Sequence, residues 1–514
     1  MTVSDNEFSK LRAFFWPIHR HELKKVLPMM LMLFFICFNY SILRNLKDAV
    51  VVTAKSSGAE VLPFIKVWVL LPMAILLTYA FTKLSNRFSQ EKVFYILISG
   101  FLLFFGLFAY VFYPLQDVLH PNQFADYLEK VLPVGFKGLI MMIRNWTFTL
   151  FYVISELWGS IVLTVLFWGF ANEVTKIHEA RRFYGTLSVI ASSAAILSGM
   201  YANSLTDPSN WEQTMNVLIG STLISGTLSM ICYGWLNKNV LQGPEYAAFH
   251  QAKIEQRAKK RLSIRESFTY LSNSKYLLCI AALVVSYNLV INMVEIVWKD
   301  QLRQLYPSPG DYNYYMNTMT IMVGIIATTS SLFMSKLINR FGWTRTALIT
   351  PMAMLITSAG FFAFMLFRYD LKDLVLYLTG TTPLAIAVFF GTAQVCISKG
   401  CKYSAFDATK EMAFIPLDHE SKLRGKAAID GVGSRLGKSG GSLIHQGLLM
   451  IFATVSSSAP YVAIILMVVI GLWIASVRSL GRQFGALTGE QETPIVVEKE
   501  EKNEIVHGEP VISS

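Results

Sequence analysis

Residues 425–449, GKAAIDGVGSRLGKSGGSLIHQGLL, are apolar enough to form a membrane helix, yet they contain the two cations Arg435 and Lys438. Three residues separate these cations, so they share one face of a helix. Small residues that recur every fourth position allow two helices to pack closely in a membrane, and here they are Gly433, Gly437 and Gly441. The stretch predicts a packed membrane helix whose cations face the protein interior.

A phosphate-binding loop is the competing interpretation, because Gly437-Lys438-Ser439 supplies the ending of that motif. The motif also requires a glycine five residues before Gly437, where this chain has Val432. The stretch continues into apolar helix and does not follow a buried strand. We therefore expect cations inside a membrane helix that face a negatively charged group.

The composition favours an all-α polytopic membrane protein. Of 514 residues, 53% are hydrophobic and only 15% are charged, and the mean hydropathy is +0.45. A helix needs about 20 apolar residues to cross a bilayer. About twelve segments satisfy this requirement, near residues 26–43, 63–82, 93–113, 146–171, 184–202, 215–236, 276–297, 316–335, 346–367, 376–397, 427–452 and 460–477.

The net charge of +11 reflects topology, since most basic residues fall in every second loop. Cytoplasmic loops are rich in Lys and Arg, so both termini are expected in the cytoplasm, and no nucleic-acid partner is indicated. The first residues do not resemble a cleavable signal or a transit peptide. We expect a multi-pass protein of a bacterial inner membrane.

An internal repeat divides the chain. KLSNRFSQEK (83–92) follows the second segment, and KLINRFGWTR (336–345) follows the eighth. The repeat predicts two six-helix halves of similar design. The expected domains are a lead-in, an N-terminal bundle, a linker, a C-terminal bundle and a disordered tail, at 1–25, 26–236, 237–275, 276–482 and 483–514.

Charged residues inside the expected spans identify a candidate site. Arg44 and Lys47 share one face of the first span, Lys66 lies in the second and Glu156 in the fourth. A charge in mid-membrane costs roughly 2.5–3.5 kcal/mol on insertion scales. The cations could instead extend to the membrane surface, whereas Glu156 has to line the bundle interior.

The second half contains the complementary set. Asn292 and Glu295 lie on one face of the seventh span, and Arg435 and Lys438 follow in the eleventh. Transporters built from repeated halves bind their substrate near the midplane between them. We expect a polyvalent anion held by the cations, with the carboxylates holding the lysines when the site is empty. Lys399 is assigned to the cytoplasmic basic residues, although it lies close to the tenth span.

Long motifs across nearly the whole chain resemble the ATP:ADP translocases of plastids and of obligate intracellular bacteria such as chlamydiae and rickettsiae. The motifs are YSILR (40–44), PFIK (63–66), SELWGS (155–160), FWGFAN (167–172), VE (294–295), DATKEM (407–412), GKAAID (425–430) and GKSGG (437–441). The resemblance implies a twelve-helix, major-facilitator-like carrier that exchanges ATP for ADP by alternating access and imports host ATP.

The resemblance also implies binding residues. The four key charged positions of the family match Lys66, Glu156, Glu295 and Lys438. We add further candidate contacts to the substrate, which are Arg44, Lys47, Asn292 and Arg435. The partners expected are nucleotides and the lipid bilayer, with a monomeric carrier, no cofactor and no metal.

Two alternatives are open at this stage. Residues 44–48 read RNLKD where many members of the family have RDTKD, so one alternative is a broader nucleoside triphosphate carrier, including a proton-coupled symporter. A membrane enzyme acting on a phosphorylated lipid is the other. Against an enzyme, the sequence shows no metal cluster and no nucleophile with a matching base.

Overall fold

A computed structural model describes residues 18–175, 177–241, 274–417, 425–426, 429 and 433–488, and within these ranges every regular element is helical. The all-α fold class is confirmed. The main helices of the first half are α2 (Leu23–Val52), α4 (Leu71–Arg87), α5 (Gln90–Leu107), α9 (Trp146–Leu157), α10 (Trp168–Val174), α11 (Ile177–Leu205) and α12 (Trp211–Leu236). Those of the second half are α15 (Lys275–Leu305), α16 (Pro309–Leu366), α18 (Pro383–Gly400), α19 (Asp407–Ala413), α21 (Ser434–Phe452) and α22 (Val455–Thr488).

Ten helical stretches of the described chain are long and apolar enough to cross a membrane. The two remaining spans expected from the sequence, 316–335 and 427–452, correspond to the first part of α16 and to α21. Several expected boundaries were wrong. The tenth helix begins at Pro383 and not at 376, because Gly380 ends the short helix α17 (Lys372–Thr379) with a positive φ and Thr382 caps the next helix.

The internal repeat has a structural counterpart at the end of the second span of each half. In the first copy, α4 ends at Arg87, Phe88 is extended and α5 begins at Gln90. In the second copy, α16 is broken at Gly342, whose φ of 74° favours glycine. The first break falls at the Phe of the shared Arg-Phe pair and the second directly after it. The prediction of two repeated halves is therefore confirmed in the backbone.

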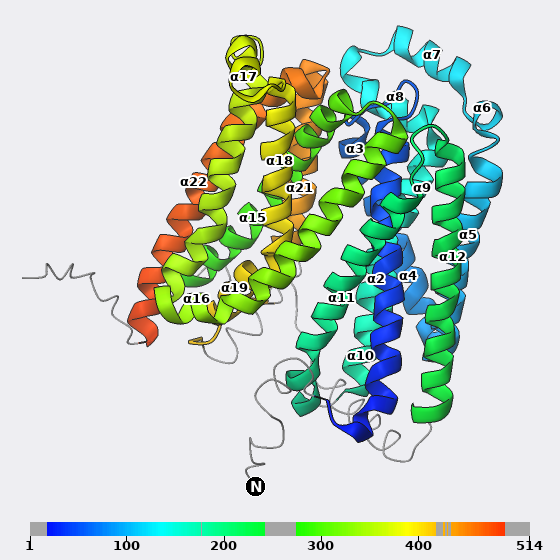
Figure 1. The fold of residues 1–514 in the computed structure, drawn as a ribbon, viewed down its shortest axis with the longest axis vertical. Helices are drawn as coiled ribbons and strands as arrows, with labels where there is room; N and C mark the ends of the chain where they lie inside the picture. The colour runs from blue at the N-terminus through cyan, green and yellow to red at the C-terminus, as the bar shows by residue number, and fades with distance from the viewer. Residues whose placement is uncertain are drawn as a thin grey trace, which may run out of the picture.

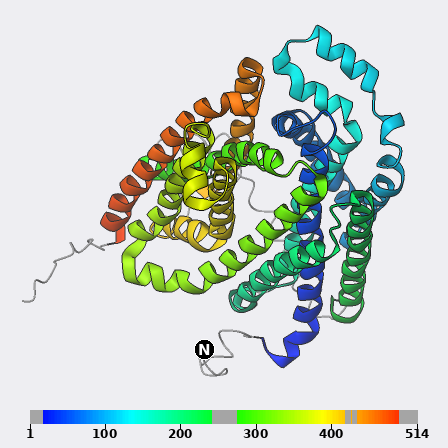
Figure 2. The same ribbon diagram turned by 45° about the horizontal axis from the view of Figure 1, so that its top comes forward.

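The two halves meet at one end of the molecule and diverge toward the other, where α2 begins (Figure 1 and Figure 2). At the end where they meet, α11 crosses α16 closely. A Cβ atom on Gly199 would lie 2.8 Å from the carbonyl oxygen of Asn317, and one on Gly324 would lie 3.1 Å from that of Ser192. Asn45 adds a hydrogen bond of 2.8 Å to Asn317. We call this end the joined end and the opposite one the divergent end.

Short helices lie at the joined end, in the connection between α5 and α9. They are α6 (Gln116–Leu119), α7 (Asn122–Val131) and α8 (Lys137–Arg144). Just before α8, Gly135 packs on the backbone of Met450 near the end of α21. This insertion therefore links the first half to the second at the joined end (Figure 1).

Helix α21 packs against α15 through the glycine spacing noted in the sequence. A Cβ atom on Gly437 would lie 2.7 Å from Cβ of Asn288, and one on Gly441 would lie 3.1 Å from Cβ of Asn292. This close approach places α21 beside the polar face of α15.

Gly437→Ala is therefore expected to lower the melting temperature, because the added methyl group would overlap α15 and overpacking typically costs about 1–3 kcal/mol. Gly447→Ala on the same helix is the matched control, since a Cβ atom there meets nothing within 4 Å. Thermal unfolding of the two purified variants checks this, and equal melting temperatures would contradict the packing described.

Candidate functional site

Six side chains of alternating charge form a continuous chain of ion pairs between the two halves. In order, they are Glu156, Lys47, Asp48, Lys299, Glu295 and Lys399. Three carboxylates and three ammonium groups balance, so the chain as a whole is neutral. Each buried charge thus has an opposite charge beside it, which is the condition under which proteins tolerate such burial.

Lys47 organises the part of this chain that belongs to the first half. Its ammonium lies 3.2 Å from Oδ1 of Asp48 and 3.2 Å from Oε2 of Glu156. The same ammonium lies 3.7 Å from the ring centre of Tyr152, close enough for a cation–π contact. Lys47 is almost fully buried, whereas 38% of the Glu156 side chain is exposed.

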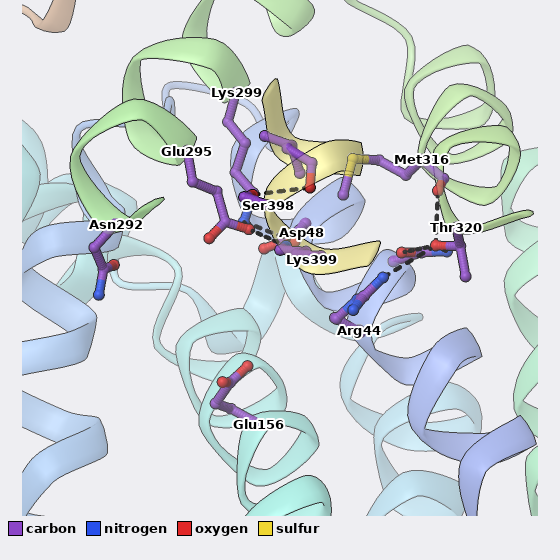
Figure 3. A network of polar contacts seen from close by, with 12 residues as sticks. Arg44, Asp48, Glu156, Asn292, Glu295, Lys299, Met316, Thr320, Ser398 and Lys399 are labelled. Atoms are coloured by element: carbon purple, nitrogen blue, oxygen red, sulfur yellow. Dashed lines mark hydrogen bonds and ion pairs between the residues drawn. The ribbon is translucent and has the colours of Figure 1, made fainter. Parts of the chain in front are cut away.

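The second half mirrors this arrangement around Glu295. Oε1 of Glu295 lies 2.9 Å from the ammonium of Lys399 and 3.3 Å from that of Lys299 (Figure 3). Lys299 follows Glu295 by one helical turn, and 2% of its side chain is exposed. Glu295 therefore holds one buried lysine and one that is partly accessible.

One ion pair connects the part of the ion-pair chain that lies in the first half with the part that lies in the second. Oδ2 of Asp48, on α2, lies 2.8 Å from the ammonium of Lys299, on α15, and both side chains are almost fully buried. The pair therefore joins the first half to the second, at the joined end.

A second connection runs through Asn292 of α15. Lys66 belongs to a π-helical segment (Ile65–Leu70) of the first half and donates a hydrogen bond of 2.7 Å to Oδ1 of Asn292. The amide nitrogen of Asn292 donates to the backbone carbonyl of Lys438 at 2.9 Å. The Lys438 side chain is exposed. The Lys66 ammonium and the Lys438 backbone thus contact the same amide, and they come from opposite halves.

Arg44 lies at the same boundary. It donates a hydrogen bond of 3.2 Å to the hydroxyl of Thr320, on α16, and lies 5.8 Å from the ring centre of Tyr40. Figure 3 draws it between Lys399 and Thr320. The guanidinium therefore contacts the second half although it belongs to the first.

The structure places seven of the eight candidate residues at the boundary between the halves, namely Arg44, Lys47, Lys66, Glu156, Asn292, Glu295 and Lys438. The backbone of the eighth, Arg435, belongs to α21, and its side chain lies outside what the structure describes. His445 lies on α21, one helical turn after Gly441. It is buried with Nε2 2.9 Å from the carbonyl of Met293, as expected of a packing residue.

Three members of the ion-pair chain were not selected from the sequence: Asp48, Lys299 and Lys399. A signal existed for Lys299, which lies one helical turn after Glu295, but the expected span ended at 297. Lys399 was assigned to the cytoplasmic basic residues, yet it pairs with Glu295 inside the bundle. Asp48 directly follows Lys47 on α2, and nothing else in the sequence distinguishes it.

Comparison with known proteins reveals the relatives of this chain. Residues 1–484 match the family described as TLC ATP/ADP transporter. ADP,ATP carrier protein 1 of Chlamydia pneumoniae is 46% identical, over 96% of this chain and 98% of the relative. ADP,ATP carrier protein 1, chloroplastic, of Arabidopsis thaliana is 40% identical, over 96% of this chain and 78% of the relative.

Solved structures agree on the fold alone. A D-xylose-proton symporter aligns over 88% of this chain and 97% of its own, with a TM-score of 0.50 and 14% identity. A bacterial homologue of the iron transporter ferroportin aligns over 91% of this chain and 100% of its own, with a TM-score of 0.51 and 11% identity. The helical fold is thus shared with these distant proteins.

Proposed function

The chain belongs to the TLC ATP/ADP transporter family, and from this premise we propose that it exchanges ATP for ADP across a membrane by alternating access. The observation that carries the proposal is that the Lys66 ammonium and the Lys438 backbone, from opposite halves, both bond to Asn292. A site shared by two repeated halves can open to either side as the halves rock. The nucleotide leaves chemically unchanged, so no catalytic step is involved.

The phosphate chain is the part of the substrate that the site is suited to bind. Lys66, Lys438, Arg44 and Lys47 supply cations, and Glu156 and Glu295 supply exchangeable carboxylates. When the site is empty, a carboxylate compensates a lysine. When a phosphate arrives, it takes the place of the carboxylate, so the empty carrier need not expose bare charge. Asn292 positions Lys66 between the two halves, and we place Arg435 of α21 among the phosphate contacts.

The proposed topology follows from the loop charges. Both termini and the 237–275 linker face the cytoplasm of a bacterial inner membrane, where they flank six-helix bundles at 26–236 and 276–482. The divergent end, where α2 begins, then faces the cytoplasm (Figure 1). The carrier acts as a monomer that imports ATP from a host cytosol and returns ADP.

Vesicles reconstituted with the purified protein test this proposal. Uptake of labelled ATP is expected to require ADP inside the vesicle and to leave the ATP intact. Uptake into empty vesicles driven by a pH gradient would indicate a proton symporter instead. Equal uptake of all nucleoside triphosphates would indicate the broader carrier, and formation of a chemical product would indicate an enzyme.

A further inference from the structure

We propose that Arg44 and Lys399, one cation from each half, form a second anion subsite that takes the terminal phosphate of ATP. This inference rests on the proposed function, because it divides the phosphate chain between two places. Lys66 and Lys438 hold the inner phosphates, and Arg44 with Lys399 holds the outermost one. Glu295 occupies Lys399 while the carrier is empty.

Arg44 has capacity to bind an anion. Its hydrogen bond to Thr320 and its contact with the Tyr40 ring are both with neutral groups. Its Nε atom is buried and has no hydrogen-bond partner among the described residues. A buried donor left without an acceptor costs about 1–3 kcal/mol. A phosphate oxygen would satisfy this donor and neutralise the guanidinium.

Lys399 can be released without exposing a bare carboxylate. Glu295 is shared between Lys399 and Lys299, so if Lys399 turns to a phosphate, Glu295 keeps its buried partner Lys299. About a fifth of the Lys399 side chain is exposed, so it is also the more accessible of the two lysines. Glu295 therefore acts as a stand-in for the phosphate at Lys399.

The internal repeat supports a direct role of Lys399 in binding phosphate. Ser155-Glu156 in the first half has its counterpart in Ser398-Lys399 in the second, and a π-helical segment follows each pair, Trp158–Phe167 and Lys402–Phe406. Each charge pairs with a residue of the first helix of its own half, Glu156 with Lys47 and Lys399 with Glu295. The two pairs are equivalent but opposite in polarity, so the second half offers a cation where the first offers a carboxylate.

Depth determines which phosphate reaches the second subsite. Along α15, Glu295 lies three residues beyond Asn292 toward the joined end, which is about 4.5 Å at the helical rise per residue. A nucleotide bound with its base toward the divergent end would have its inner phosphates at Lys66 and α21, beside Asn292. Lys399 pairs with Glu295 at this level, so the third phosphate of ATP extends to it, and ADP ends before it.

Equilibrium binding of ATP and ADP to purified Lys399→Gln tests this subsite. We expect ATP binding to weaken by roughly 10- to 100-fold, as is typical for losing a charge-assisted hydrogen bond, and ADP binding to weaken much less. Lys399→Arg should retain the preference for ATP. Lys372→Gln is the matched control, because this lysine is exposed on α17 at the joined end.

Equal weakening of ATP and ADP binding in Lys399→Gln, or no weakening, would overturn the subsite, since a merely structural ion pair would not distinguish the two nucleotides. Arg44→Gln gives a second test with the same expectation, should Lys399→Gln fail to fold. Measuring ATP/ADP exchange by the wild-type protein in the same preparation separates failure of the subsite from failure of the proposed function. If exchange is normal and the ATP:ADP affinity ratio is unchanged in both variants, only the subsite fails. If the wild-type protein shows no exchange, the proposed function fails.

Discussion

Replacing both Lys66 and Lys438 by alanine is expected to abolish measurable ATP binding while the protein stays folded. Each ammonium supplies a charge-assisted hydrogen bond to phosphate, worth about 1.5–3 kcal/mol, so losing both weakens binding by at least about a hundredfold. Folding is expected to tolerate the change, because Lys66 bonds to a neutral amide and the Lys438 side chain is exposed.

Calorimetric titration of the purified double variant with ATP measures this loss, with thermal unfolding as the check on folding. Lys372→Ala again provides the control for removing a lysine from an exposed site. If the folded double variant bound ATP with wild-type affinity, neither lysine would belong to the nucleotide site.

Asp48→Asn is expected to have the largest effect on stability. Asp48 pairs with Lys47 and Lys299, and all three side chains are almost fully buried. Removing one partner of a buried ion pair typically costs about 3–5 kcal/mol, because the remaining charge stays buried. The ion-pair chain would then hold three ammonium groups against two carboxylates. We expect a large drop in melting temperature in detergent.

The double variant Asp48→Asn/Lys299→Gln restores the balance of charge, because the pairs Lys47–Glu156 and Glu295–Lys399 remain. It should therefore unfold at a higher temperature than Asp48→Asn alone. A double variant as unstable as the two separate losses combined would show that the two residues act independently, contrary to the contact described.

The sequence predicted the fold to a large extent because lipid imposes strong constraints on it. Apolar length revealed most spans, and the repeated KL-x-N-R-F segments revealed the two halves. Boundaries were less accurate where a short helix precedes a span, as where α17 precedes α18. The short helices from 116 to 144 escaped notice because their apolar faces are brief.

The candidate site was predictable where a charge interrupts an apolar run, as at Lys66 and Glu156. The partners in the ion pairs were not predictable, because Asp48 contacts Lys299 only when the two halves pack together. Lys399 illustrates the same limit. A lysine at the end of a span has the appearance of a topology signal, and only the position of Glu295 opposite it reveals another role.

The position of the phosphate chain in a nucleotide-bound structure tests the central claim most directly. The account predicts phosphate oxygens within about 3 Å of the Lys66 and Lys438 ammonium groups, so that both halves contact one nucleotide. A nucleotide held by one half alone, with its phosphates away from both lysines, would contradict it.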